Sequence, residues 1–339
     1  MISLEQTLYV GCALSGEIYT VELSLATGEL THLSHARLPG LNKPGGAMPL
    51  ALSRDRNTLY AVSRGEPFFI AAFNLGPQGN LHHLGNTFIN NNLAYIQTDT
   101  NDNYLLTASF IDHQVATYLI QADRCIGRPV QCIENISNAH MLSMSPDNKT
   151  VLCTGLGEDV IYHWQWAPSQ SNEHTSPPMY YIGQLQLPNG TGPRHIAYHP
   201  NQPIAYVIGE RNGTINTISC SVTGLRNIQT VDLPEQPEAF QAADIHITPD
   251  ARFLYASEKA TSTLSLFNVQ ADGTLTFVAQ FATENRPRGF AITPDGNYLV
   301  AAGQYSHHIA SYRINPETGS LRLISRLPVG QSPDWVEML

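Results

Sequence analysis

Positive charge is scarce in this chain. Its 339 residues include 18 lysines and arginines against 28 aspartates and glutamates, a formal net charge of −10 at pH 7. A protein that binds nucleic acid needs a basic face to neutralise phosphates. A protein held at an anionic membrane surface needs clustered lysine and arginine. The composition therefore argues against nucleic acid and against a membrane as partners.

Cysteine pairs and long apolar runs are also missing. The five cysteines include no Cys-x-x-Cys pair, so neither a disulfide framework nor a zinc site is expected, and small buried thiols are. No apolar run approaches the ~18 residues that a membrane-spanning helix needs. Residues 1–6 lack the basic and apolar regions of a signal peptide. These absences predict a soluble, cytoplasmic protein without a metal or other cofactor.

A sustained helical period is absent too, which excludes a helical solenoid. In its place six turn signals recur, such as 248–255 and 293–300, in which Asp or Asn bonds its own backbone and proline often presets the turn. The steps between aligned residues are 46, 46, 54, 49 and 45, for Asp55, Asn101, Asp147, Asn201, Asp250 and Asp295. The longest step coincides with the polar insert 167–178, which is expected to be an exposed loop.

Each turn signal lies between two short β-rich runs, and two further β-rich runs follow. Four strands in ~45 residues are typical of a propeller blade. The six signals give six blades, and the termini supply a seventh. Segments 6–10, 17–23 and 28–33 provide its second to fourth strands, and 331–339 provides the first. We therefore predict one all-β domain over residues 1–339. It is a seven-bladed β-propeller with four antiparallel strands per blade, its ring closed by the C-terminal strand.

The repeats allow equivalent positions to be compared. Residues seven before and nine after each turn Asp or Asn should lie at the open end of the hairpin and line one mouth of the central channel. The polar ones are Arg64, His140, Arg194, Glu210, Lys259, Arg288, Gln304 and, from the C-terminal strand, Asp334. Converging cations favour an anion site, and arginine matches carboxylate or phosphate through its fork. The alternative is that these are ordinary channel-lining groups bridged by water.

Thirteen histidines offer further candidates. His195 is followed by another histidine four positions later. Residues at this spacing share one face of a helix, but not in a strand followed by a turn, so zinc ligation is not expected. Asp244 and His246 share one strand face and could form a hydrogen-bonded pair, whereas at most one of His307 and His308 faces the channel. The sequence contains no Gly-x-Ser-x-Gly elbow and no phosphate-binding glycine loop before a helix.

Four motifs together resemble a known family, the bacterial propeller-type 6-phosphogluconolactonases, which belong with the fungal carboxy-muconate lactonising cycloisomerases. The motifs are Gly192-Pro-Arg-His with His199-Pro-Asn, Ala242-Ala-Asp-Ile-His, Arg286-Pro-Arg-Gly-Phe and Ala302-Gly-Gln with Ser306-His-His-Ile. The resemblance covers essentially the whole chain. It implies hydrolysis of 6-phosphoglucono-1,5-lactone to 6-phosphogluconate in the pentose phosphate pathway, without a metal. It also implies a catalytic set that matches His140, Arg194, Glu210 and Arg288 here.

Two departures from the family pattern concern cations. Lys259 stands where family members carry an arginine, and segment 155–159 lacks a lysine of the family, whereas Arg64 is retained. The resemblance thus implies a weaker contact with the phosphate and leaves the ring chemistry less affected.

The residues suggest a division of roles. Glu210, alone or with His140, would be the general base for an attacking water. Arg194 and Arg288 would stabilise the oxyanion. The substrate-binding candidates are Arg64, Lys259 and His308 for the phosphate, with His195, Asp244, His246 and Gln304.

Three functions compete at this stage. A lactonase for a small anionic sugar lactone is favoured. A lactonising cycloisomerase, or a lactonase for an unphosphorylated lactone, is second. A non-catalytic platform that binds a protein is third. The chain is expected to be a monomer or a weak homo-oligomer.

Overall fold

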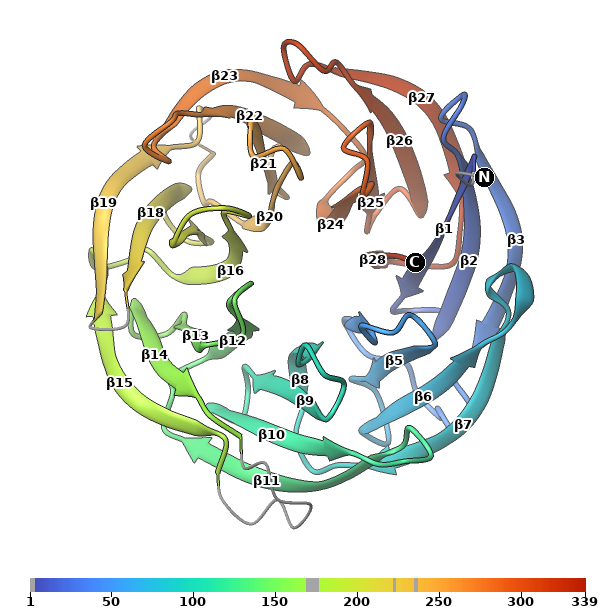
Figure 1. Cartoon of the computed structure of the whole chain (residues 1–339). Helices are drawn as coiled ribbons and strands as arrows, with labels where there is room; N and C mark the ends of the chain where they lie inside the picture. The colour runs from blue at the N-terminus through green and yellow to red at the C-terminus, as the bar shows by residue number, and fades with distance from the viewer. Residues whose placement is uncertain (1–3, 169–176, 222–223, 235–236) are drawn as a thin grey trace.

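Seven four-stranded antiparallel sheets stand in a ring around a central channel, with the first strand of each sheet innermost (Figure 1). The computed structural model describes residues 4–168, 177–221, 224–234 and 237–339. The first three sheets are β28 (Pro333–Met338), β1 (Glu5–Cys12), β2 (Glu17–Ser24), β3 (Leu30–Arg37); β4 (Leu50–Leu52), β5 (Thr58–Ser63), β6 (Phe69–Leu75), β7 (Leu81–Phe88); and β8 (Leu93–Thr98), β9 (Tyr104–Ser109), β10 (Gln114–Ile120), β11 (Ile126–Glu134). A 3₁₀ turn, η1 (Pro77–Gly79), joins β6 to β7.

The other four sheets repeat the pattern. They are β12 (Ala139–Met144), β13 (Thr150–Gly155), β14 (Val160–Trp166), β15 (Met179–Gln186); β16 (Pro193–Tyr198), β17 (Ile204–Gly209), β18 (Thr214–Ser221), β19 (Gly224–Asp232); β20 (Ala242–Ile247), β21 (Phe253–Glu258), β22 (Thr263–Val269), β23 (Leu275–Ala282); and β24 (Pro287–Ile292), β25 (Tyr298–Gly303), β26 (His308–Ile314), β27 (Leu321–Pro328). The predicted seven-bladed propeller is confirmed. Residues 169–176 of the predicted insert lie outside the described residues.

The ring closes as the sequence predicted. β28 pairs antiparallel with β1, with Val336 opposite Val10 and Met338 opposite Leu8, so the C-terminus lies inside the N-terminal blade (Figure 1). Asp334 is fully buried there. The pairing gives β1 a partner strand on both sides, β28 and β2, so β1 is not left as an unpaired edge.

The turn signals have the hydrogen bonds that their chemistry predicts. The hydroxyls of Ser53, Thr248 and Thr293 donate to the carboxylates two residues later, at 2.7, 2.6 and 2.6 Å. The residue after the turn Asp lies in the left-handed region at Arg56, Asn148, Ala251 and Gly296, with φ of 57°, 57°, 61° and 73°. Of these, only glycine adopts that conformation without a steric cost.

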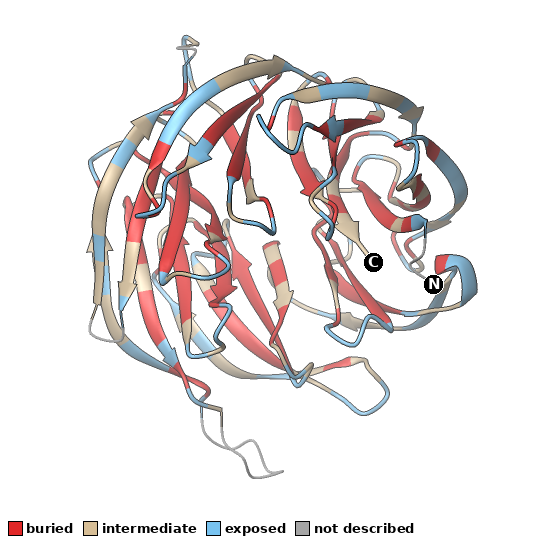
Figure 2. Ribbon diagram, turned by 45° about the horizontal axis from the view of Figure 1, so that its top comes forward, coloured by how far each residue is buried: buried red, intermediate tan, exposed pale blue. Residues whose placement is uncertain are grey.

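The core lies between blades, because each inner strand is covered on both faces. Buried residues dominate the inner strands, and the outermost strands carry the intermediate and exposed ones (Figure 2). Buried tyrosines connect neighbouring blades: the hydroxyl of Tyr206 donates to Gly273 O at 2.8 Å and that of Tyr255 to Gly319 O at 2.6 Å. Tyr298 makes the same contact with Leu25 O, at 3.2 Å, across the closing blade. Among the described residues, no helix has the length and apolar character needed to cross a bilayer.

An irregularity in strand pairing recurs at the same point of most inner strands. The register shifts between Ala139 and Leu142, between Pro193 and Ile196, and between Ala242 and Ile245. Similar shifts occur in β8, β24 and β28. A bulge of this kind re-aims side chains that a regular strand would send to alternate faces. It therefore brings consecutive residues of the inner strands toward the channel.

Candidate active site

A cavity of about 330 Å³ opens at the end of the channel that lies away from the turn signals. Its size falls in the range of small-molecule sites. The bulges and the ends of the second strands bring its side chains together, from Gly46, Arg64, Asn92, Ala94, Phe110, Ile111, His140, Arg194, Glu210, Lys259 and Arg288. The predicted positions Arg64, His140, Arg194, Glu210, Lys259 and Arg288 all line this cavity.

Glu210 is the single carboxylate among the described residues that line the cavity, and it forms ion pairs with two cations. Its Oε2 lies 3.1 Å from Arg194 Nε, and its Oε1 lies 3.4 Å from Lys259 Nζ. Glu210 directly follows β17, and Arg194 is on the neighbouring β16, where its guanidinium also donates to Ala243 O. Burial would raise the pKa of Glu210, but Arg194, Lys259 and Arg288 together outweigh it and hold the pKa below its usual value. Glu210 is therefore ionised at neutral pH.

Arg288 and Arg64 complete the positive wall. Arg288 Nε lies 3.8 Å from Asp334 Oδ2, and the Asp334 carboxylate accepts the backbone N–H of Met48 at 3.2 Å. Burial raises the pKa of Asp334 to about 6, although Arg288 opposes the shift. Arg64 Nε donates to Asn92 Oδ1. Burial, and then repulsion from Arg288, lower the pKa of Arg64 to about 10.

The environment of the cavity disfavours the charged forms of its basic side chains. Burial, followed by the charge of Arg194, lowers the pKa of Lys259 to about 7, and burial lowers that of Arg194 to about 10. Four basic side chains face one lining carboxylate, so the site is short of negative charge. An anionic ligand would supply that charge, because converging cations attract anions even in an acidic protein.

His140 lies between the cations and the apolar wall. It is 5% exposed, and its ring packs edge-on against Phe110, with centroids 6.0 Å apart. Burial and then the charge of Arg194 lower its pKa well below the usual value. His140 is thus a neutral imidazole, and its Nδ1 has no hydrogen-bond partner among the described residues.

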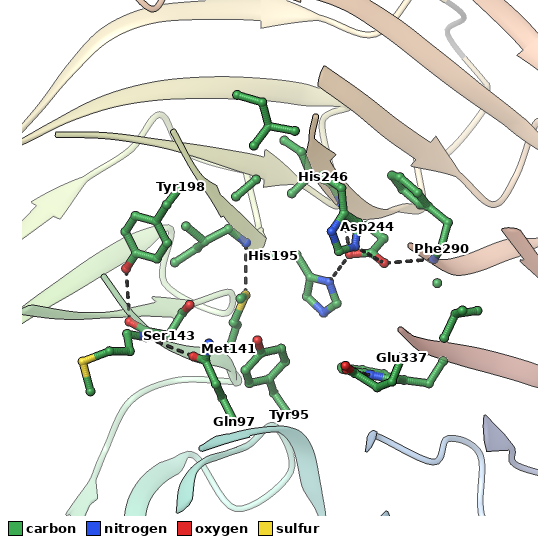
Figure 3. Close-up of a pocket in the computed structure, with 18 of the residues that line it drawn as sticks. Tyr95, Gln97, Met141, Ser143, His195, Tyr198, Asp244, His246, Phe290 and Glu337 are labelled. Atoms are coloured by element: carbon green, nitrogen blue, oxygen red, sulfur yellow. Dashed lines mark hydrogen bonds and ion pairs between the residues drawn. The ribbon is translucent and has the colours of Figure 1, made fainter. Parts of the chain in front are cut away.

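The other predicted substrate-binding residues are not brought to this cavity. His195, Asp244 and His246 line a different cavity at the turn end of the channel, because the bulges send successive residues to opposite ends (Figure 3). Within that group the expected pair does form, with His246 Nε2 3.2 Å from Asp244 Oδ2.

Gln304 and His308 line neither cavity. The buried Gln304 is held through its backbone N–H, which donates to Arg286 O. His308 Nδ1 lies 2.6 Å from Ser306 O, on the side of the blade where Glu284 pairs with Arg326. The position of His308 therefore does not support a contact with the phosphate.

Five lining residues were not singled out from the sequence as functional, and one of them is Gly46. Phe110 and Ala94 occupy the compared repeat positions but carry no polar group. Asn92 orders Arg64, and Ile111 covers one side, yet both lie outside those positions. The recurring spacing of the hairpins could have pointed to Phe110 and Ala94 as walls, but no signal in the sequence marks Asn92.

Comparison with known proteins places this chain in a family. Residues 7–338 match the family described as lactonase, seven-bladed β-propeller. The 6-phosphogluconolactonase of Pectobacterium carotovorum is 33% identical over 99% of both chains. That of Photorhabdus laumondii is 34% identical, again over 99% of both.

Solved structures agree with the fold. A protein of Bacteroides fragilis, provisionally titled a 6-phosphogluconolactonase, superposes with a TM-score of 0.89 at 26% identity and covers 99% of this chain and 98% of its own. The periplasmic gluconolactonase of Pseudomonas aeruginosa gives a TM-score of 0.86 at 23% identity, with 99% of both chains covered, and supports the fold alone. On this evidence, the chain belongs to the seven-bladed β-propeller lactonase family.

Proposed function

We propose that this protein hydrolyses a sugar-acid lactone, 6-phospho-D-glucono-1,5-lactone, to 6-phospho-D-gluconate, a step of the pentose phosphate pathway. The observation that carries the proposal is the cavity in which Arg64, Arg194, Lys259 and Arg288 surround the carboxylate of Glu210. Relatives named 6-phosphogluconolactonase, 33% identical along the whole chain, support the same substrate.

The chemistry follows from the charges. A water attacks the lactone carbonyl carbon while the ionised Glu210 accepts a proton from it, and the carbonyl oxygen becomes an oxyanion. Arg194 and Arg288 offer N–H donors and positive charge for that oxyanion, a type of contact worth about 2.7–4 kcal/mol per donor. The bond from the carbonyl carbon to the ring oxygen then breaks, and the proton reaches the ring oxygen by way of the neutral His140. The products are a hydroxyl group and a carboxylic acid, which releases its remaining proton to water and becomes a carboxylate.

Arg64 and Lys259 are proposed to bind the phosphate. Each directly follows the second strand of its blade, β5 or β21, and both line the cavity. Burial is the main cause of their lowered pKa values, about 10 and about 7, and the charges of neighbouring arginines add to it. A phosphate dianion would stabilise the charged form of both side chains.

Replacing the proposed base tests the function. Glu210→Gln keeps the shape of the side chain and removes its proton acceptor, so turnover of freshly generated 6-phosphogluconolactone should fall by roughly 10²–10⁴-fold. Binding of 6-phosphogluconate, measured by calorimetry, should change little. Turnover is measured against the spontaneous decay of the lactone, and Glu317→Gln, on an exposed turn, is the matched control. Unchanged turnover in Glu210→Gln would show that the base is another group.

The second candidate is a lactonase for an unphosphorylated lactone. The lysine at position 259, in place of a bidentate arginine, is the observation that favours it. Turnover of D-glucono-1,5-lactone as fast as that of its 6-phosphate would select this alternative. Isomerisation without net hydrolysis would select a cycloisomerase, and no turnover of either lactone would leave a binding platform. A cytoplasmic location, and a monomeric or weakly associating state, are part of the same proposal.

A further inference from the structure

A second and larger cavity, of about 550 Å³, lies at the other end of the channel. It opens among the turn signals and includes Arg54 and Pro146 from two of them. The bulged strands run from one cavity to the other. Arg194 lines the first cavity and His195, the next residue, lines the second, so the two spaces hold different side chains. Nothing in the proposed lactone chemistry uses the second cavity.

His195 is held in one orientation by Asp244. Its Nδ1 lies 2.7 Å from Asp244 Oδ1, as Figure 3 shows. The same carboxylate accepts the backbone N–H groups of Ile245 at 3.0 Å and Phe290 at 3.2 Å. Burial would raise the pKa of Asp244, but His246 and His195 outweigh it and hold the pKa well below its usual value. Because an ionised carboxylate only accepts hydrogen bonds, the proton of neutral His195 must sit on Nδ1.

The other nitrogen of His195 is consequently an acceptor without a partner. His195 is 6% exposed, and its Nε2 has no hydrogen-bond partner among the described residues. In Figure 3 this nitrogen faces the space between Tyr95 and Glu337. Burial of an unsatisfied polar group is costly, so the position suits a ligand that donates an O–H or N–H group.

Aromatic rings form the walls around this acceptor. The ring of Tyr95 lies 5.8 Å from that of His195 and 5.7 Å from that of Trp335, between centroids. Phe290 packs edge-on against His246 at 4.7 Å. Trp335 Nε1 donates to Glu337 Oε1 at 2.9 Å, which fixes the indole. Flat apolar faces beside directed polar groups are typical of small-ligand sites.

The charges that face the cavity nearly balance. The negative Asp244 is paired with His246, whose pKa is raised because Asp244 outweighs its burial. Burial raises the pKa of Glu337 to about 7, so at neutral pH this acid is only partly charged. Arg54 stands exposed at the rim. The second cavity therefore lacks the excess of cations that marks the first.

We propose that the second cavity binds an uncharged, hydroxyl-rich ring, an unphosphorylated sugar. A sugar hydroxyl would donate to His195 Nε2, and the C–H face of the ring would pack against Tyr95 and Trp335. An anion finds no cluster of cations here. A cationic amine would meet Arg54 and His246, whose pKa is raised by Asp244.

Trp335 reports on this site directly, because the other two tryptophans, Trp164 and Trp166, are buried in the core between blades. Titration with D-glucose should change the tryptophan fluorescence in a saturable way, with a dissociation constant in the millimolar range. Trp335→Phe should remove the signal. Tyr95→Ala and His195→Phe should each weaken binding at least tenfold, while Glu210→Gln, in the lactone cavity, should leave the glucose titration unchanged.

The outcomes separate this proposal from the lactonase. Absence of a saturable response to glucose, or a response that survives in both Tyr95→Ala and His195→Phe, overturns it. Stronger binding of 6-phosphogluconate or of protonated glucosamine through Tyr95 and His195 overturns the assignment to a neutral ligand. Circular dichroism establishes that each variant is folded, and if His195→Phe fails to fold, Tyr95→Ala decides. None of these measurements depends on lactone turnover.

Discussion

At the scale of single residues, the lactone cavity differs from an ordinary polar channel because the pKa values of its basic side chains are lowered. Arg64 and Arg194 have pKa values lowered to about 10 and stay charged at neutral pH. Lys259, with a pKa lowered to about 7, titrates close to it. A lysine has no fixed fork and shifts its pKa readily when buried. The positive charge available for an anion therefore depends on pH through this one side chain.

Binding of 6-phosphogluconate should weaken as the pH rises from 7 to 9. The lowered pKa of Lys259 means that the ammonium is lost as the pH rises through about 7, whereas the phosphate is already a dianion over this range. The loss of one charged contact predicts about a tenfold rise in the dissociation constant, measured by calorimetry in buffers of equal ionic strength.

Two variants check the source of this pH dependence. Lys259→Met should bind weakly at pH 7 and show little further change to pH 9. Lys259→Arg should bind well across the range, because guanidinium does not deprotonate. A wild-type pH profile in Lys259→Met would exclude this lysine as the titrating group.

There is a physical reason why the sequence located some of the site residues and not others. Arg194 and Glu210 were found because turn chemistry is local, so counting from each turn fixes the open end of the hairpin. The place of Asp244 and His195 was missed because it depends on the bulge, and a bulge is a property of how two strands pair. The composition of either strand alone does not reveal it.

At the scale of elements, the short closing strand β28 has several structural roles. β28 pairs with β1, buries Asp334 completely and leaves Val336 6% exposed. It also positions Arg288 through Asp334 and supplies Trp335 to the second cavity. The blade pattern predicted this closure, since the N-terminal segment lacked a first strand. The contacts of Asp334 with Met48 and Arg288 could not be deduced, because they join three blades.

Deleting residues 334–339 should lower the free energy of unfolding by about 4 kcal/mol or more, because it exposes the edge of β1 and opens the core beside it. Urea denaturation followed by circular dichroism measures the loss. Adding a synthetic peptide of residues 331–339 should restore part of it, since the missing strand can pair in trans. A truncated protein that unfolds at the wild-type urea concentration would contradict a structural role for β28.

At the scale of the whole molecule, the ring gathers side chains from blades far apart in sequence. Arg64, His140, Arg194, Lys259 and Arg288 come from five different blades and meet in one cavity. The chain as a whole is acidic, with a net charge of −10, yet this cavity concentrates cations. Because each blade is a complete four-stranded sheet, the arrangement should not depend on which blade holds the ends of the chain.

A circular permutant tests that independence. The backbone N–H of Leu339 donates to Thr7 O at 2.9 Å, so a short glycine-serine linker can join Leu339 to Leu4. New ends between the exposed Ala271 and Asp272 would move the closure to the blade of β20–β23. The permutant should fold, with a melting temperature within several degrees of the parent, and should keep its lactone turnover within about threefold. Loss of folding would show that the closing blade has a special role.

The pairing of β1 with β28 also has a consequence during synthesis. β1 leaves the ribosome long before its inner partner, Pro333–Met338. Until those residues emerge, the inner edge of β1 has no partner strand and is open to pairing with other chains. The second cavity, which Trp335, Val336 and Glu337 line, also stays incomplete until β28 has been made.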